Sequence, residues 1–250
     1  MKKEIQKFFS YLKSKDKQGF KILFLTTSNR WVGDKELPKS SQLALDIRDK
    51  LSNCEVIDVS KLKIFPCEGN VSRGKGNNCG IKEALLKDDK KNPHKILRCW
   101  ASMNNPTDEL YVVANKIFES DIVVFFGSVR WGKMNAIYSQ LIERLTWLEN
   151  RHASLGESNL LKDKEAGIVA MGHNWNGHDV VDLEKQVLKY FGFKIPKELS
   201  FNRQWTTDPT DESISGYKQD HKDFLKEKTI IESLKESFKD FADWIDKKFS

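Results

Sequence analysis

Short apolar runs alternate along this chain with longer segments in which apolar residues recur every three or four positions. Five of the runs have the length of strands, and continuous apolar character is typical of strands that are covered on both faces. The run at 121–126 has the strongest strand pattern. The five predicted strands are 21–25, 54–59, 121–126, 165–171 and one within 193–201, the last weakened by Pro196.

The segments between these runs follow a helical period. Leu43, Ile47 and Leu51 share one face of such a segment, and the C-terminal stretch carries the longest apolar stripe, which predicts an amphipathic helix. The predicted helices are an N-terminal extension within 1–19, then 40–51, 107–118, 135–148, 179–191 and 220–249.

Strand and helix alternate five times, which favours a parallel sheet joined by right-handed crossovers. Five units with short connections predict an α/β three-layer sandwich with a five-stranded parallel sheet in the flavodoxin-like order 2-1-3-4-5, rather than a six-stranded dinucleotide-binding sheet. The N-terminal helix is extra to this plan. The exception is a long insert at 61–106, which we expect to act as a lid because connections of that length are usually functional. We expect the whole chain, 1–250, to form one domain.

Composition narrows the possible classes of protein. The 250 residues are 39% hydrophobic, with 15 Phe and 7 Trp, which is enough apolar material for a core. The net charge is +6, but lysines and acids are interleaved, so no nucleic-acid partner is expected. No apolar run reaches the roughly 18 residues of a membrane span, and no secretory leader is recognisable at the start. With four cysteines, reduced thiols and a cytoplasmic location are expected, with no membrane partner.

Ligands of open α/β sheets bind outside the carboxyl ends of the strands, so the loops after strands one, three and four are the candidate site. The first loop combines hydroxyl groups with Arg30, and Lys39 opens the next helix. Such groups at a helix N-terminus suit a phosphate monoester, although an ordinary serine N-cap beside a surface arginine is the competing interpretation. The loop lacks the motifs of phosphate-binding NTPases and of dinucleotide-binding folds. The candidate contacts are Thr27, Ser28, Arg30, Lys39, Ser40 and Ser41.

The other two loops combine small residues, aromatic side chains and polar groups, which suit a flat ligand. Glycine allows the backbone to approach such a ligand closely, and Trp131 is either a stacking residue or a core aromatic. His173 and His178 have no Cys or acid close in sequence to complete a metal site, so no metal is expected. The candidates in the second loop are Gly127, Ser128, Val129, Arg130, Trp131, Gly132 and Lys133, and those in the third are Gly172, His173, Asn174 and Gly177.

Three segments resemble the flavodoxin-like family of NAD(P)H-dependent FMN reductases and oxidoreductases. They are Thr27-Ser-Asn-Arg30 with Lys39-Ser40, Ile64-Phe-Pro-Cys-Glu-Gly-Asn-Val-Ser72, and Gly127-Ser-Val-Arg-Trp-Gly132 followed by Tyr138 and Arg144-Leu145, spread in family order over residues 20 to about 200. The resemblance implies that Ser28, Arg30, Lys39 and Ser40 cradle the FMN phosphate. It also implies that Ser128 to Lys133 lie along the isoalloxazine and that Gly172 to Gly177 close its far edge.

Two positions depart from the family pattern. Ser128 stands where the family usually has proline, which offers an extra hydroxyl. Asn70 stands where some iron–sulfur relatives have a third cysteine, and Cys67 and Cys79 lack the spacing of a compact cluster site, so no cluster is expected.

The resemblance implies a cytoplasmic, homodimeric oxidoreductase that binds FMN, uses NAD(P)H as co-substrate and reduces a small acceptor such as a quinone, a nitro compound or free flavin. The flavin carries the chemistry, so no catalytic side chain is expected. Two alternatives stay open. One is a flavodoxin-type electron carrier without nicotinamide turnover, against which the net charge of +6 argues, since such carriers tend to be acidic. The other is a binding protein that has kept the fold and lost the cofactor.

Overall fold

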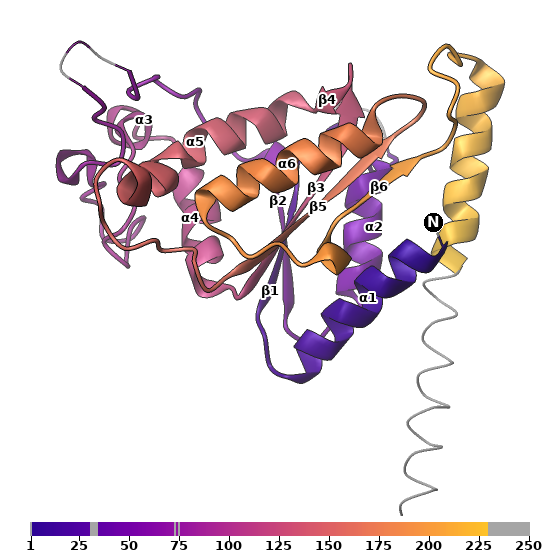
Figure 1. Ribbon diagram of the computed structural model, residues 1–250, viewed down its shortest axis with the longest axis horizontal. Coiled ribbons are helices and arrows are strands. Elements are labelled where there is room, and N and C mark those ends of the chain that lie inside the picture. The colour runs from indigo at the N-terminus through magenta and orange to yellow at the C-terminus, as the bar shows by residue number, and fades with distance from the viewer. Residues whose placement is uncertain (1, 31–34, 73, 75, 230–250) are drawn as a thin grey trace, which may run out of the picture.

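The sheet has the predicted strand order. The computed structural model describes residues 2–30, 35–72, 74 and 76–229. Five parallel strands lie in the order β2-β1-β3-β5-β6, which is 2-1-3-4-5 when the parallel strands alone are counted (Figure 1). A short strand, β4, pairs antiparallel with the end of β3 and was not predicted. The strands are β1 (Ile22–Thr26), β2 (Cys54–Asp58), β3 (Ile122–Arg130), β4 (Lys133–Met134), β5 (Glu165–Gly172) and β6 (Phe201–Gln204).

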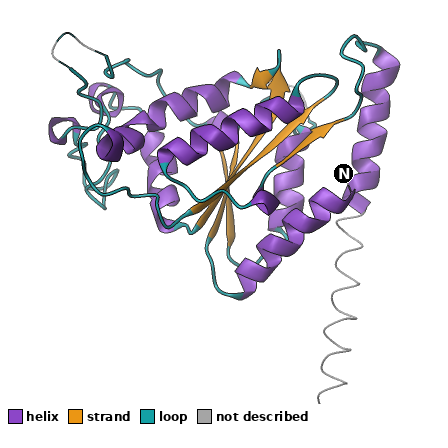
Figure 2. Cartoon of the chain, viewed as in Figure 1, coloured by secondary structure: helices purple, strands orange, loops and turns teal. Residues whose placement is uncertain are grey.

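Helices cover both faces of the sheet, as Figure 2 shows. Because successive strand residues point to opposite faces, Leu23 and Leu25 pack in one hydrophobic layer with α4, α5 and α6. Ile22 and Phe24 pack in the other layer with α1, α2 and Phe224. The helices are α1 (Lys2–Lys17), α2 (Lys39–Arg48), α3 (Trp100–Asn104), α4 (Leu110–Glu119), α5 (Ala136–Ala153) and α6 (Gly177–Phe191), with single 3₁₀ turns at Val59–Lys61, Lys82–Ala84 and Lys197–Leu199.

The N-terminal helix α1 is part of the core. Phe8 and Leu12 are fully buried, and the Phe8 ring packs edge-on against Phe126 and Phe201 at centroid distances of 6.1 and 5.3 Å. Burying a phenylalanine or leucine side chain contributes about 1.5–3 kcal/mol. The segment predicted as an extension therefore covers one face of the sheet.

The fifth parallel strand lies later than its predicted position. The stretch from 193 contributes only an isolated bridge between Glu165 and Lys194. Pro196 has no N–H to donate, and the chain forms a 3₁₀ turn at Lys197–Leu199 before it pairs with β5 from Phe201 onward. Pro196 and the turn after it thus separate most of the predicted strand from the observed strand β6.

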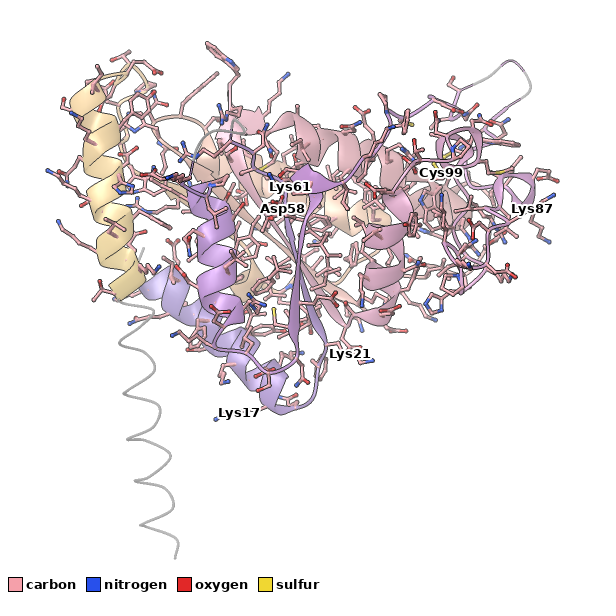
Figure 3. The ribbon with its side chains drawn as sticks, turned by 180° about the vertical axis from the view of Figure 1, so that it is seen from behind. Lys17, Lys21, Asp58, Lys61, Lys87 and Cys99 are labelled. Carbon is pink, nitrogen blue, oxygen red and sulfur yellow. The ribbon has the colours of Figure 1, made fainter. Side chains whose placement is uncertain are left out.

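The insert, residues 61–106, is fixed to the body of the molecule by a buried arginine. Arg144 on α5 and Asp108 are both fully buried and 2.9 Å apart. Arg144 also donates to the Phe65 carbonyl and to Ser102 Oγ, at 2.5 and 2.9 Å. Figure 3 shows Lys61 at the end of β2 and Lys87 far from it, at one end of the molecule.

The C-terminal segment, which we define as residues 205–229, returns across the carboxyl edge of the sheet. Residues 214–229 are helical, so this helix begins before the predicted residue 220, and the rest of the predicted 220–249 helix lies outside the described residues. Phe224 is buried in the core, and Glu227 forms an ion pair of 2.7 Å with Arg203 of β6. No helix in the described part of the chain is both long and apolar enough to cross a membrane.

Candidate functional site

A cavity of about 190 Å³ lies at the carboxyl ends of β1, β3 and β5. All three loops that the sequence predicts to converge reach its wall, and the C-terminal segment completes it. The lining residues are Ser28, Asn29 and Arg30 after β1, Pro38, Lys39 and Ser40 at the start of α2, Ser128, Val129 and Arg130 of β3, Met171, Gly172 and His173 at the end of β5, and Trp205, Tyr217 and Asp220.

The start of α2 gives the cavity an anion-binding character. Pro38 stands at the N-cap position and makes no side-chain capping hydrogen bond. The N–H groups of the first helical turn have no partner within a helix, and the helix dipole favours negative charge there. Ser28 Oγ and Ser40 Oγ lie 2.7 Å apart, so two hydroxyls are held at the same wall. These groups are suited to the oxygens of a phosphate.

Lys39 adds a partly desolvated cation to this wall. Burial lowers the pKa of the Lys39 ammonium, and the positive charge of Arg30 lowers it further, whereas the carboxylate of Asp220 acts in the opposite direction. The ammonium also lies 5.6 Å from the centre of the Trp205 ring. An anion bound here would stabilise the charged form of Lys39, since opposite charges favour each other's ionisation.

Thr27 and Gly127 hold two of the loops together behind the cavity wall. The Thr27 hydroxyl lies 2.9 Å from Asn135 Oδ1, and Asn135 Nδ2 donates to the Thr27 carbonyl at 2.5 Å. A Cβ on Gly127 would lie 2.3 Å from Met134 Cε and 2.9 Å from Thr27 Oγ1, so a larger residue here would require these side chains to shift. The sequence predicted both as ligand contacts, but neither lines the cavity. Ser41 is also buried beside the wall without lining it.

The predicted second loop is a β-hairpin. β3 continues to Arg130, and a turn at Trp131 and Gly132, with φ of 51° and 67°, leads into β4. Trp131 is 90% exposed, so it is not a core aromatic. Trp131, Gly132 and Lys133 do not line the cavity; Trp131 and Lys133 instead border a second, more open hollow beside Pro66. Of the predicted loop, Ser128, Val129 and Arg130 form the cavity wall.

The loop after β5 joins the cavity to the C-terminal segment. Gly172 and His173 line the wall. Asn174 Nδ2 donates to the carbonyl of Asp211 at 3.0 Å, and the Gly177 N–H donates to Gln204 Oε1 at 3.1 Å. Asn174 and Gly177 were predicted as ligand contacts. In the structure they form hydrogen bonds with later segments of the same chain and do not line the cavity.

His173 is the centre of this contact. Its Nδ1 lies 2.5 Å from Asp220 Oδ2, its side chain is 9% exposed, and its ring packs on Tyr217 at a centroid distance of 4.3 Å. His178, in contrast, has a side chain that is 80% exposed. Within the described ranges, no group of three His, Cys, Asp or Glu side chains is arranged to hold a metal ion.

Sequence reasoning missed Trp205, Tyr217 and Asp220. The apolar period of the C-terminal stretch predicts a helix but does not say where that helix packs. Asp220 meets His173 from 47 positions further along the chain. No motif marks these three residues, and only the tertiary structure brings them to the cavity.

Unpaired buried polar atoms in the wall are suited to a polar ligand. Among the residues that the structure describes, Ser128 Oγ and Trp205 Nε1 are buried without a hydrogen-bond partner, and His173 Nε2 is buried with the Asp211 carboxylate 3.8 Å away, beyond hydrogen-bond distance. A buried polar group left unpaired costs about 1–3 kcal/mol. All three residues line the cavity, so a phosphate-bearing ligand with hydroxyl groups fits the donor set.

The cysteines lie away from this cavity. Cys67 and Cys79 are partly buried, and Cys99 is buried. Burial raises the pKa of the Cys79 thiol to about 11. The thiol form therefore prevails at neutral pH, and the thiolate is the form that attacks electrophiles and binds metals.

Comparison with known proteins identifies the fold. No protein-family model matches the sequence, and no curated protein matches it. The chain is similar to the crystal structure of RosB with bound 8-demethyl-8-formylriboflavin-5'-phosphate, at a TM-score of 0.53 and 16% identity over 92% of this chain and 87% of RosB. It therefore has the flavodoxin-like α/β fold, in agreement with the order of its parallel strands.

Two bacterial azoreductase structures give lower scores. One is an FMN-dependent NADH-azoreductase from Bacillus anthracis str. Ames Ancestor in complex with FMN, with a TM-score of 0.48 and 9% identity over 85% of this chain and 99% of the other. The other is an azoreductase from Bacillus anthracis str. Sterne, with a TM-score of 0.48 and 12% identity over 85% and 98%.

Proposed function

We propose that this chain is an FMN-binding, NAD(P)H-dependent oxidoreductase that passes electrons to a small acceptor such as a quinone, a nitro compound or free flavin. The observation that carries the proposal is the uncapped N-terminus of α2, which lies at the cavity with Lys39 and the paired hydroxyls of Ser28 and Ser40. The flavin phosphate in the similarly folded RosB supports it.

The phosphate end of FMN would be held by Ser28, Arg30, Lys39 and Ser40 with the first N–H groups of α2. A hydrogen bond to a charged group contributes about 1.5–3 kcal/mol when it is desolvated. Several such contacts acting together are sufficient to retain a phosphate dianion. Ser128 and Trp205 would offer their unpaired hydroxyl and N–H to the rest of the molecule.

The size of the cavity determines which part of the ligand is enclosed. Pockets that surround a drug-sized ligand measure about 300–1,000 Å³, whereas this cavity measures about 190 Å³. The walls can therefore enclose only part of an FMN molecule. The part outside the walls would be open to a second reactant, as an oxidoreductase with a nicotinamide donor and a separate acceptor requires.

When bound, FMN supplies the capacity to accept a hydride and release electrons. The residues of this chain then have to bind the cofactor, orient it and keep its phosphate in place, and no side-chain base is required. The proposal includes NADPH or NADH as the reductant and, from the family resemblance, a homodimer.

An absorbance spectrum of the freshly purified protein tests this proposal. We expect the bands of an oxidised flavin, and we expect them to bleach when NADPH or NADH is added under nitrogen. Bleaching by a reductase protein but not by a nicotinamide would indicate the electron carrier. A colourless protein whose melting temperature does not change with added FMN would contradict the proposal, because a ligand at about 100 times its Kd adds roughly 2.7 kcal/mol of stability.

A further inference from the structure

The phosphate end of the cavity is lined in part by residues that lie outside the segments of family resemblance. Trp205, Tyr217 and Asp220 line the cavity, and all three follow the last strand, beyond the segments over residues 20 to about 200 that carry the resemblance. They form one wall, which we call the C-terminal wall. These side chains therefore limit the space for a ligand at this end.

The C-terminal wall stands beside the cation of the phosphate site. Lys39 Nζ lies 5.6 Å from the centre of the Trp205 ring. The Asp220 carboxylate is also close enough to Lys39 to favour its charged form. Because Lys39 opens α2, these two residues bound the space at the helix N-terminus, where a phosphate would bind.

Three contacts fix the C-terminal wall in place. Asp220 pairs with His173 at 2.5 Å. Tyr217 packs on the same His173 ring. The guanidinium of Arg203 lies 4.4 Å from the centre of the Trp205 ring and forms a buried ion pair with Glu227. The wall is thus tied to the sheet from both ends of the C-terminal segment.

We propose that the C-terminal wall selects a flavin that ends in a phosphate monoester, FMN, and rejects a flavin whose phosphate continues into a second phosphate and an adenosine, FAD. This inference rests on the proposed function, since it concerns the same cavity. FMN and FAD share the flavin, the ribityl chain and the first phosphate, so only the space and charge beyond that phosphate distinguish them.

Space gives the first reason for this selectivity. The cavity of about 190 Å³ is bounded at the α2 end by Pro38, Trp205 and Asp220. An adenosine that extended from the phosphate on this side would meet these side chains. Because Trp205 and Asp220 are held by the contacts above, displacing them would disrupt packing and an ion pair.

Charge gives the second reason. A phosphate monoester places its charge next to Lys39 and Arg30, where the helix N-terminus adds a positive potential. A diphosphate extends negative charge toward Asp220, which is 6% exposed. Like charges that approach within a few ångströms in a partly desolvated site repel each other, so the second phosphate is disfavoured. Such a repulsive element is how binding sites reject a close analogue.

Isothermal titration of the full chain with FMN and with FAD tests the inference. We expect the Kd for FMN to be at least about tenfold lower than the Kd for FAD. Equal affinities would overturn the inference and leave the proposed function standing. If neither flavin binds, the proposed function fails and the inference fails with it.

Two variants assign the selectivity to the C-terminal wall. Tyr217→Ala removes a ring that is 44% exposed, and Asp220→Asn removes the charge while keeping a partner for His173. In both we expect the ratio of FAD to FMN affinity to rise by about fivefold or more. Tyr190→Ala, which truncates a side chain that is 74% exposed on α6, is the matched control and should leave the ratio unchanged. An unchanged ratio in folded Tyr217→Ala and Asp220→Asn proteins, checked by thermal melting, would overturn the assignment.

Discussion

The insert at 61–106 follows edge strand β2, and the C-terminal segment at 205–229 follows the other edge strand, β6. Of their described residues, only those of the C-terminal segment line the cavity. Each is fastened by a buried arginine and a carboxylate, Arg144 with Asp108 for the insert and Arg203 with Glu227 for the C-terminal segment. The two extensions lie at opposite ends of the molecule in Figure 1. No described residue of the insert lines the cavity, and a role of the insert as a lid stays a prediction.

The two regions also differ in charge. The insert contains ten of the 42 basic residues and four of the 36 acidic ones, so it accounts for the whole net charge of +6, and the rest of the chain is neutral, with 32 of each. The positive character of the cavity depends instead on three local cations, Arg30, Lys39 and Arg130, and on a helix N-terminus. Net charge alone therefore says little about where an anion binds.

Removing the carboxylate that fastens the insert should have the largest effect. Asp108→Ala leaves Arg144 fully buried without its partner, which typically costs about 3–5 kcal/mol. Urea unfolding followed by circular dichroism measures the loss. A loss below about 1 kcal/mol would show that the ion pair is not what holds the insert.

A double variant sharpens this test. Replacing both partners, as Arg144→Met with Asp108→Leu, removes the buried charges together, and such replacements are often neutral or stabilising. We expect much of the stability lost in Asp108→Ala to return in the double variant. FMN affinity should be the same in all the folded proteins, because the pair does not line the cavity.

The next largest effect is expected at the cavity. Lys39→Met removes a desolvated cation, and the loss of a charge-assisted contact of about 1.5–3 kcal/mol corresponds to a roughly ten- to hundredfold weaker affinity for FMN. Stability without ligand should not fall, because burial already disfavours the charged ammonium. Calorimetric titration measures the affinity, and an affinity equal to that of the parent protein would remove Lys39 from the site.

Weakening the attachment of the C-terminal segment should have a smaller effect on stability. Glu227→Gln keeps a hydrogen-bonding side chain beside Arg203 but removes the negative charge, and we expect a loss of about 1–3 kcal/mol. Unlike the changes at the insert, this variant should also reduce the preference for FMN over FAD. A lower melting temperature with unchanged preference would show that the wall does not depend on this pair.

Acid should lower the free energy of unfolding through Asp108, the carboxylate that fastens the insert. Burial raises the pKa of Asp108, but hydrogen bonds from Arg144, the Phe65 N–H and Ser102 outweigh burial and hold the pKa below its usual value. The unfolded chain therefore takes up the proton first as the pH falls below about 4, and the folded state loses stability at up to about 1.4 kcal/mol per pH unit. Asp108→Asn should flatten this part of the curve of unfolding free energy against pH. An unchanged slope would contradict the assignment.

Neutralising lysines of the insert should have the smallest effect. Lys87 and Lys90 are exposed, and exposed substitutions usually change stability by no more than about 0.5 kcal/mol. Lys87→Gln with Lys90→Gln lowers the net charge but should leave the Kd for FMN unchanged at physiological salt, because screening limits interactions over long distances. An affinity loss similar to that of Lys39→Met would show that net charge, rather than local placement, attracts the ligand.

The sequence predicts the regular part of this molecule well. Continuous apolar runs identify β1, β2, β3 and β5, and the rule for strand ends brings Ser28, Ser128 and Gly172 to one cavity. The hairpin at Trp131 was missed because β4 has only two residues, too few for a pattern. Trp205, Tyr217 and Asp220 were missed because their position depends on contacts with residues far away in the sequence.

The ratio of the dissociation constants for FMN and riboflavin, measured by calorimetry on the full chain, shows whether the cavity binds the phosphate of a flavin. The two ligands differ only in the phosphate, which we expect to bind at the start of α2 beside Lys39. We predict that FMN binds at least about a hundredfold more tightly than riboflavin, because several charge-assisted contacts depend on that group. Equal dissociation constants would contradict the account.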